Sequence, residues 1–189
     1  SVVFCGALSL NDGCIDVTVA PGEEGRPALI SLSPATGFVT IDNRCTTTAN
    51  KAEHVVSFTR KPGANRIVVG GRFYAKAAPW TESVTVEDPA MYFGTVLRET
   101  LDRGGVAAGE AALERLAAPF DPPEELGPPL VSSTTLRAAL GVMLRRSQNF
   151  YAEQTLRALG PRGGTFDQCA AAGLRALEPL GVKEGDVAW

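Results

Sequence analysis

Apolar and polar residues alternate over short runs in the first 88 residues, which predicts β-strands. Cys14–Val19 alternates throughout and is followed by the turn residues Pro21-Gly22. The turn cluster Lys61–Asn65 joins two later runs and predicts a hairpin. Short strands separated by turns favour antiparallel sheet over βαβ units. The other runs are Ala28–Leu32, Phe38–Ile41, His54–Thr59, Arg66–Gly70, Tyr74–Trp80 and Ser83–Val86.

A helical pattern replaces this alternation after residue 88. Asp88-Pro89 is a favourable helix start, because Asp caps the first turn and Pro is tolerated in it. Gly104-Gly105 should end this helix. Its predicted apolar face consists of Tyr92, Val96, Leu97 and Leu101.

Five prolines between Pro119 and Pro129 mark the clearest boundary in the chain. We therefore expect a β-rich part over residues 1–118, a linker over 119–129 and a helical part over 130–189. The expected N-caps in the helical part are Ser133 or Thr134 for the first helix, and Thr165 or Asp167 for a last helix that extends to about Leu180.

Two helical arms in the last third of the chain flank the tripeptide Ser147-Gln148-Asn149. Ser and Asn form helices poorly because their side chains compete for backbone hydrogen bonds, so this tripeptide predicts a bend. Gly160-Pro161 should end the second arm. The apolar positions of the arms are Leu136, Leu140, Met143 and Leu144 before the bend, and Phe150, Ala152, Leu156 and Leu159 after it.

The stretch Met143–Gly160 resembles the second active-site motif of penicillin-binding proteins, in particular D-alanyl-D-alanine carboxypeptidases of the class C low-molecular-mass type. Gly6–Gly22, Asn65–Gly71 and Asp88–Val106 resemble successive segments of the same family, and together the resemblance covers nearly all 189 residues. Gln148 departs from the acidic residue that many members carry at this variable position.

The resemblance implies an α+β fold. Antiparallel β-rich insertion domains would precede part of the helical half of a penicillin-binding, β-lactamase-like domain. For Val106–Leu116, Ala and Glu content favours a helix, whereas the resemblance implies a returning strand.

The resemblance also implies two site residues. In a Ser-x-x-Lys hydrolase, a lysine amine takes the proton of the nucleophilic serine if its pKa is lowered by burial or charge. Ser147 would relay a proton to the leaving group, and the Asn149 carboxamide would hold the substrate backbone. Without the resemblance, both are ordinary helix-junction residues. The implied ligands of the complete enzyme are peptidoglycan stem peptides and β-lactams, in the periplasm or outside the cell, with no cofactor and no metal.

The nucleophile motif of that family is absent from this chain. None of the nine serines has Lys three residues later, and no Lys-Thr-Gly occurs. We therefore interpret the chain as an internal portion of a serine-type D-Ala-D-Ala carboxypeptidase/endopeptidase, and expect it to be inactive alone. The alternative is a non-catalytic module that binds cell-wall polymer or a partner protein. Helices that pack on missing segments would expose apolar side chains.

Composition excludes two classes of partner. The net charge is −3 and basic residues do not cluster, which argues against nucleic acid. A run of about 18 apolar residues, which a membrane span needs, is absent, and so is a signal-peptide pattern. The sequence leaves the oligomeric state and the preference between carboxypeptidase and endopeptidase activity open.

Other candidate chemistry has simpler explanations. Cys5, Cys14, Cys45 and Cys169 lack zinc spacing; a Cys14–Cys45 or Cys5–Cys14 bridge would suit a secreted protein, and four free thiols are an equal alternative. His54 should be a half-exposed strand residue and not a triad base. The acidic residues Asp12, Asp16, Asp42 and Glu23-Glu24 are expected to be structural. The aromatic residues Phe73, Tyr74 and Trp80 could stack on a sugar ring, but at sheet positions they are expected to lie in the core.

Overall fold

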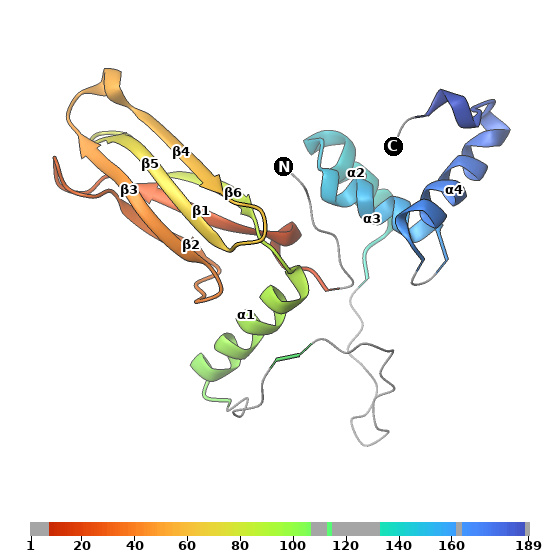
Figure 1. The fold of residues 1–189 in the computed structure, drawn as a ribbon, viewed down its shortest axis with the longest axis horizontal. Helices are drawn as coiled ribbons and strands as arrows, with labels where there is room; N and C mark the ends of the chain where they lie inside the picture. Colours follow the sequence, from red (N-terminus) through yellow and green to blue (C-terminus); the bar gives the residue numbers. More distant parts are fainter. Residues whose placement is uncertain (1–7, 107–112, 115–132, 162–163, 188–189) are drawn as a thin grey trace. The chain divides into compact units, whose positions relative to one another are not determined.

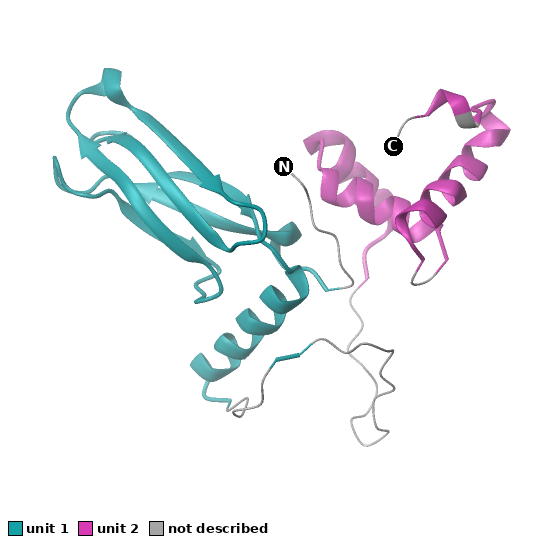
Figure 2. Cartoon of the chain, viewed as in Figure 1, with its two compact units in different colours: residues 1–119 teal, residues 120–189 magenta. Residues whose placement is uncertain are grey.

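Residues 8–106, 113–114, 133–161 and 164–187 are described by a computed structural model. The chain divides into two units, Ser1–Pro119 and Phe120–Trp189 (Figure 2). Cys5, most of the segment Val106–Leu116 and the proline-rich linker 119–129 lie outside the described residues. Among the described helices, none has the length and apolar composition needed to cross a membrane.

Among the described residues, the first unit contains six strands, one long helix and two short 3-10 turns, and the second contains three helices and two short 3-10 turns (Figure 1). The strands are β1 (Cys14–Ala20), β2 (Leu29–Ser33), β3 (Thr40–Thr48), β4 (Val55–Arg60), β5 (Arg66–Tyr74) and β6 (Trp80–Thr85). The helices are α1 (Pro89–Arg103), α2 (Leu136–Arg146), α3 (Asn149–Leu159) and α4 (Phe166–Leu177), and the short turns are η1 (Asn11–Gly13), η2 (Lys51–Glu53), η4 (Glu178–Leu180) and η5 (Glu184–Asp186). The α+β class predicted from sequence is confirmed.

The strands form two three-stranded sheets, in the orders β2-β1-β6 and β3-β5-β4 (Figure 1). The predicted hairpin of β4 and β5 is confirmed. One pairing differs from the antiparallel prediction, because β3 runs parallel to β5, with Thr40 opposite Arg66 and Cys45 opposite Gly71. The tight turn after β4 makes it the antiparallel neighbour of β5, and β3 pairs with the other side of β5 in the parallel direction.

The two sheets share one hydrophobic core. Strand alternation directs every second side chain of β1 inward, and Ile15, Val17 and Val19 are fully buried. From the other sheet, Ile67, Val69 and Phe73 of β5 and Cys45 of β3 are also fully buried in the same cluster. Phe73 was expected in the core and lies there. Trp80 was also expected there but is 40% exposed, because β6 is an edge strand. The Trp80 ring still packs edge-on against the Phe58 ring, with 5.4 Å between the ring centres.

Helix α1 continues the core. Asp88 caps it as predicted, accepting a hydrogen bond from the Met91 backbone N–H, and Gly104 ends it. Tyr92 is fully buried and its hydroxyl donates to the Cys14 carbonyl at 3.2 Å. Val96 is buried as well, but Leu97 is 47% exposed, so the apolar face predicted from sequence was one residue too wide.

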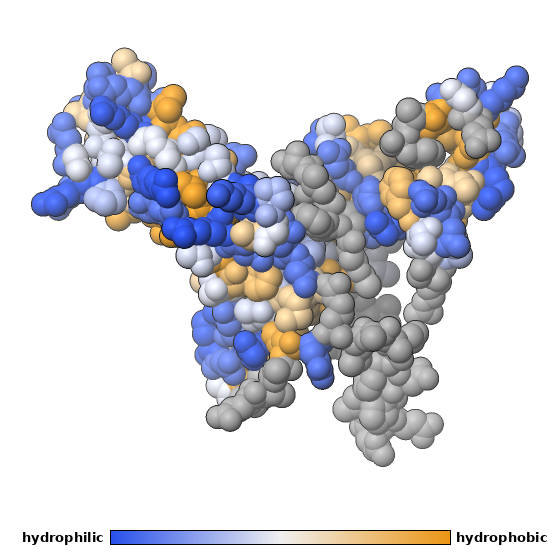
Figure 3. Space-filling view, in the orientation of Figure 1, coloured by the Kyte–Doolittle hydropathy of each residue, from blue (hydrophilic) through white to orange (hydrophobic). Residues whose placement is uncertain are grey.

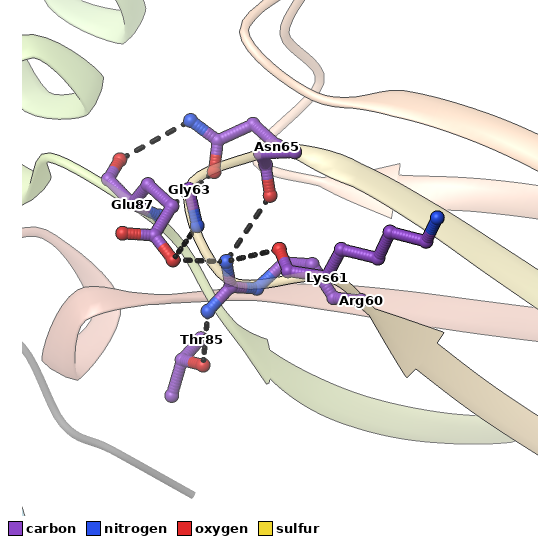
Figure 4. Close-up of polar contacts among 7 residues, drawn as sticks. Arg60, Lys61, Gly63, Asn65, Thr85 and Glu87 are labelled. Carbon is purple, nitrogen blue, oxygen red and sulfur yellow. Dashed lines mark hydrogen bonds and ion pairs between the residues drawn. The ribbon is translucent and has the colours of Figure 1, made fainter.

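A polar cluster links the two sheets at the end of the unit where α1 begins (Figure 4). Arg60 of β4 forms an ion pair with Glu87, which follows β6, and its guanidinium also donates to Thr85 Oγ1 at 3.3 Å. Glu87 accepts a further hydrogen bond from the Gly63 backbone N–H, and Asn65 bonds both the N–H and the C=O of Glu87. The Arg60 side chain is only 11% exposed, so this ion pair is shielded from water.

The second unit has little core among its described residues. Helix α2 packs on α3, and α3 on α4, but α2 and α3 contain no buried residue. Leu144, Leu159 and Leu180 are 76%, 51% and 77% exposed, in agreement with the predicted exposure of apolar side chains. Figure 3 shows hydrophobic residues at the surface of this unit. The first helix is capped by Thr135 and not by Ser133 or Thr134, whereas Thr165 caps α4 as predicted.

Replacement of Ile67 by Ala tests the shared core. We expect the free energy of unfolding of the first unit to fall by about 2–5 kcal/mol, because the substitution removes buried methylene groups and leaves a cavity. Urea unfolding measures this loss. The control is Leu97→Ala on the exposed side of α1, which should cost about 1 kcal/mol or less; equal losses would contradict the assignment of the core.

The pH dependence of unfolding tests the Arg60–Glu87 ion pair. The hydrogen bond from Arg60, followed by that from the Gly63 N–H, holds the pKa of Glu87 below its usual value of 4.5. The contribution of ionised Glu87 to the free energy of unfolding is therefore complete above pH 4.5 and is lost as the pH falls through the lower pKa of the folded state.

We expect Glu87→Gln to unfold at lower urea concentration near pH 7 and to show a weaker dependence of the midpoint on pH below about 5. Glu23→Gln, which changes an exposed glutamate of the same unit, is the matched control. Identical pH profiles for the wild type and Glu87→Gln would exclude this role for the ion pair.

Candidate functional site

Ser147 and Asn149 lie at the junction of α2 and α3, as the sequence predicted. Helix α2 ends at Arg146 and α3 begins at Asn149. Both residues are exposed. The positive end of the α3 dipole lies at the same junction, where it favours negative charge on a bound group.

Ser147 has a left-handed backbone conformation, with φ 51° and ψ 44°. The N–H groups of Ser147 and Gln148 both bond to the Met143 carbonyl, the second at 3.2 Å; the first is the bond of an αL helix end and the second is the 6→1 bond that a Schellman end also has. Such a position normally carries glycine, because a left-handed conformation costs other residues about 1–2 kcal/mol. The junction therefore has a serine at a position where the backbone conformation favours a residue without a side chain.

The far end of α3 is fixed by Gly160. A Cβ atom at Gly160 would collide with the sulfur of Cys169 on α4, so only glycine permits this close approach. A hollow of about 440 Å³ lies here, lined by Gln154, Arg157 and Gly164 among others. Neither Ser147 nor Asn149 lines it, so the candidate site and this hollow lie at opposite ends of α3.

Of the cysteine arrangements that the sequence left open, the structure has free thiols at the described positions and no Cys14–Cys45 bridge. Cys14, Cys45 and Cys169 are free thiols, whereas Cys5 lies outside the described residues. The reason is strand alternation: Cys14 lies on the half-buried face of β1, opposite the fully buried Ile15, whereas Cys45 is buried in the core. Burial, then the charges of Asp12 and Asp16, raises the pKa of Cys14 to about 11, and burial also raises the pKa of Cys45. Both thiols are therefore poor nucleophiles at neutral pH.

His54 has a structural role. It lies just before β4 and not within the strand, and it is exposed. Its Nδ1 accepts a hydrogen bond from the Tyr74 backbone N–H at 2.9 Å, and its ring packs edge-on against Phe73 at 4.9 Å. These contacts occupy the imidazole nitrogen that a catalytic base would present to a carboxylate partner.

The acidic residues serve the sheets. Asp16 accepts a hydrogen bond from Ser83 of the neighbouring strand, and Asp12 lies in the turn η1 with positive φ. In the part of the chain that the structure describes, no group of three or more His, Cys, Asp or Glu side chains could hold a metal ion. Asp42 lies between Arg44 and Arg66, an arrangement that the sequence did not reveal. The i, i+2 spacing of Asp42 and Arg44 on one strand was a usable signal, but Arg66 enters only through the pairing of β3 with β5.

Comparison with known proteins gives consistent matches. The model of the D-Ala-D-Ala carboxypeptidase 3 (S13) family matches residues 5–188. The D-alanyl-D-alanine carboxypeptidase of Actinomadura sp. (strain R39) is 33% identical over 174 residues, which are 90% of this chain and 32% of that protein.

Two solved structures of penicillin binding protein 4 (dacB) from Haemophilus influenzae have the same fold. One superposes with a TM-score of 0.64 at 16% identity, over 97% of this chain and 41% of the other. The second, a complex with a β-lactam, gives 0.61 at 18% identity, over 94% and 41%. The chain thus spans about a third of its curated relative and 41% of these solved chains. The family predicted from the sequence is confirmed: the chain belongs to the D-Ala-D-Ala carboxypeptidase 3 (S13) family.

Proposed function

We propose that this chain is the part of a serine-type D-Ala-D-Ala carboxypeptidase/endopeptidase that carries the second active-site element, Ser147 and Asn149. The enzyme would act on peptidoglycan stem peptides in the bacterial cell envelope. Family membership supports the reaction class. The single observation that supports the site is the left-handed conformation of Ser147 at an exposed helix junction.

The conformation of Ser147 favours a functional role over a purely structural one. A residue that only ended α2 would usually be glycine, which adopts φ above zero without steric cost. Strained conformations of this kind persist where a side chain has to be held in a fixed direction, and they concentrate at functional sites. A glycine at this position would lack the hydroxyl group, so we infer that the hydroxyl is the reason for serine here.

The chemistry assigned to the two side chains follows from their hydrogen-bonding capacity. A serine hydroxyl donates one proton and accepts others, so Ser147 can accept a proton from a protonated lysine and pass its own to the nitrogen of the departing D-Ala. The Asn149 carboxamide has both a donor and an acceptor, which match the C=O and N–H of the substrate backbone. The acyl-forming serine and its lysine would come from a Ser-x-x-Lys motif, which these 189 residues lack.

Substitution of Ser147 by Gly separates stability from function. We expect the free energy of unfolding of the second unit to rise by about 1 kcal/mol, because glycine relieves the left-handed strain. Ser147→Ala keeps the strained backbone and should show no gain. Thermal unfolding of both variants measures the difference, and destabilisation by Ser147→Gly would contradict the assigned conformation.

Labelling by a fluorescent penicillin tests the proposed function. The 189-residue chain should remain unlabelled, because a β-lactam acylates a nucleophile that the chain does not carry. In a longer polypeptide with flanking Ser-x-x-Lys and Lys-Thr-Gly segments, Ser147→Ala should slow acylation by about 10²–10⁴-fold, the usual contribution of a proton-transfer group. Ser133→Ala, an exposed serine of the same unit, is the control.

Three outcomes would contradict the proposal. Stoichiometric labelling of the 189-residue chain would show that its nucleophile had been missed. Equal rates for Ser147→Ala and Ser133→Ala would remove Ser147 from the reaction. Coding sequence without the two flanking motifs would favour the non-catalytic module instead.

A further inference from the structure

The outer face of the β3-β5-β4 sheet carries basic residues in a hollow. This hollow has a volume of about 600 Å³, within the range of small-ligand sites. Strand alternation places Arg44 and Arg66 on the outer face, opposite the buried Cys45 and Ile67. The complete lining is Asp42, Arg44, Thr59, Arg60, Lys61, Ala64, Arg66 and Val68.

One carboxylate lies between two arginines in this hollow. Arg44 binds Asp42 through two nitrogens, at 3.2 and 2.7 Å, and Arg66 binds it through Nη2 at 2.8 Å. The hydrogen bond from Arg44, together with that from Arg66, lowers the pKa of Asp42, so this carboxylate stays ionised. The two arginine side chains are 66% and 64% exposed, whereas Asp42 is 18% exposed. The two guanidinium groups thus face solvent, whereas the Asp42 carboxylate that they share is largely covered.

Lys61 adds a third exposed cation. No ion pair of its ammonium group is found among the described residues. Figure 4 shows its side chain extending away from the Arg60–Glu87 cluster. The guanidinium of the preceding residue, Arg60, lies on the core side of the sheet, where it bonds Glu87 and Thr85, so Lys61 is the exposed cation at this end of β4. The lining of the hollow therefore contains three exposed cations, Arg44, Lys61 and Arg66, and one carboxylate.

We propose that this hollow binds the free terminal carboxylate of a short peptide. Arg66 and Lys61 would bind the carboxylate, since a guanidinium offers paired N–H donors that match two carboxylate oxygens. Thr59 offers a hydroxyl in the same lining. The apolar side chains of Val68 and Ala64 would contact a small apolar side chain beside that carboxylate. The site lies in the first unit, so the proposal does not depend on a catalytic role for Ser147 or Asn149.

Charge favours a peptide over a polyphosphate chain. The ionised Asp42 inside the hollow repels a dianionic phosphate more strongly than a single carboxylate. Binding to a polymer of phosphates would also need a run of cations beyond the hollow. The whole chain carries a net charge of −3, which does not favour such binding.

Titration of the intact 189-residue chain by ¹H–¹⁵N NMR tests the proposal. The probe is the tripeptide acetyl-Lys-D-Ala-D-Ala, and the matched control is its C-terminal amide, which has the same shape without the charge. We expect the free acid to shift the amides of Asp42–Arg44, Thr59–Lys61 and Arg66–Val68. Arg66→Gln and Lys61→Gln should each weaken binding about tenfold, the loss expected for one charge-assisted hydrogen bond. Added salt should weaken it further.

Variants away from the hollow complete the test. Arg26→Gln removes an exposed arginine of the first unit that does not line the hollow, and it should leave binding unchanged. Equal binding of the amide, or tighter binding of poly(glycerol phosphate), would overturn the proposal. Binding that is lost in Ser147→Ala but kept in Arg66→Gln would also overturn it, by moving the ligand to the second unit; that result would leave the proposed function intact.

Discussion

A single apolar layer shared by two small sheets is the constraint on which the first unit depends. Each three-stranded sheet has one apolar face, and burying that face against the other sheet removes apolar surface from water, which is the main favourable contribution to folding. Ile15 and Val17 from one sheet and Ile67 and Phe73 from the other are fully buried in one cluster. Every outward position then follows from alternation, including the arginines of the outer face. The basic hollow is therefore a consequence of how the core is built.

Polar contacts secure the ends of this arrangement. The shielded Arg60–Glu87 ion pair joins the turn after β4 to the residues between β6 and α1, so it couples both sheets to the start of the helix. Removal of one partner would leave an uncompensated charge in a shielded place, which is why the pair holds the connection together. Lys61, which lines the basic hollow, is the residue that follows Arg60, so this ion pair holds the end of β4 from which Lys61 extends.

Local chemistry was readable from the sequence. The alternation of Cys14–Val19, the cap at Asp88 and the Thr165 cap each depend on neighbours within a few residues, and the structure has each of them. The bend at Ser147 also follows locally, since Ser and Asn disfavour a continuous helix. The family was predicted from the residues of such short segments, and the match of the family model confirms it. The site roles of Ser147 and Asn149 remain a proposal that rests on this bend.

Pairing over long distances was not readable. The pairing of β3 with β5 requires β5 to lie between β3 and β4 in the sheet, and no local pattern encodes that strand order. The missing Cys14–Cys45 bridge, the exposure of Trp80 and the meeting of Asp42 with Arg66 all follow from this tertiary arrangement. The sequence determined the elements and their inner faces through side-chain periodicity. Only the tertiary structure decided which outer faces meet, because cross-strand neighbours are set by register and sheet order.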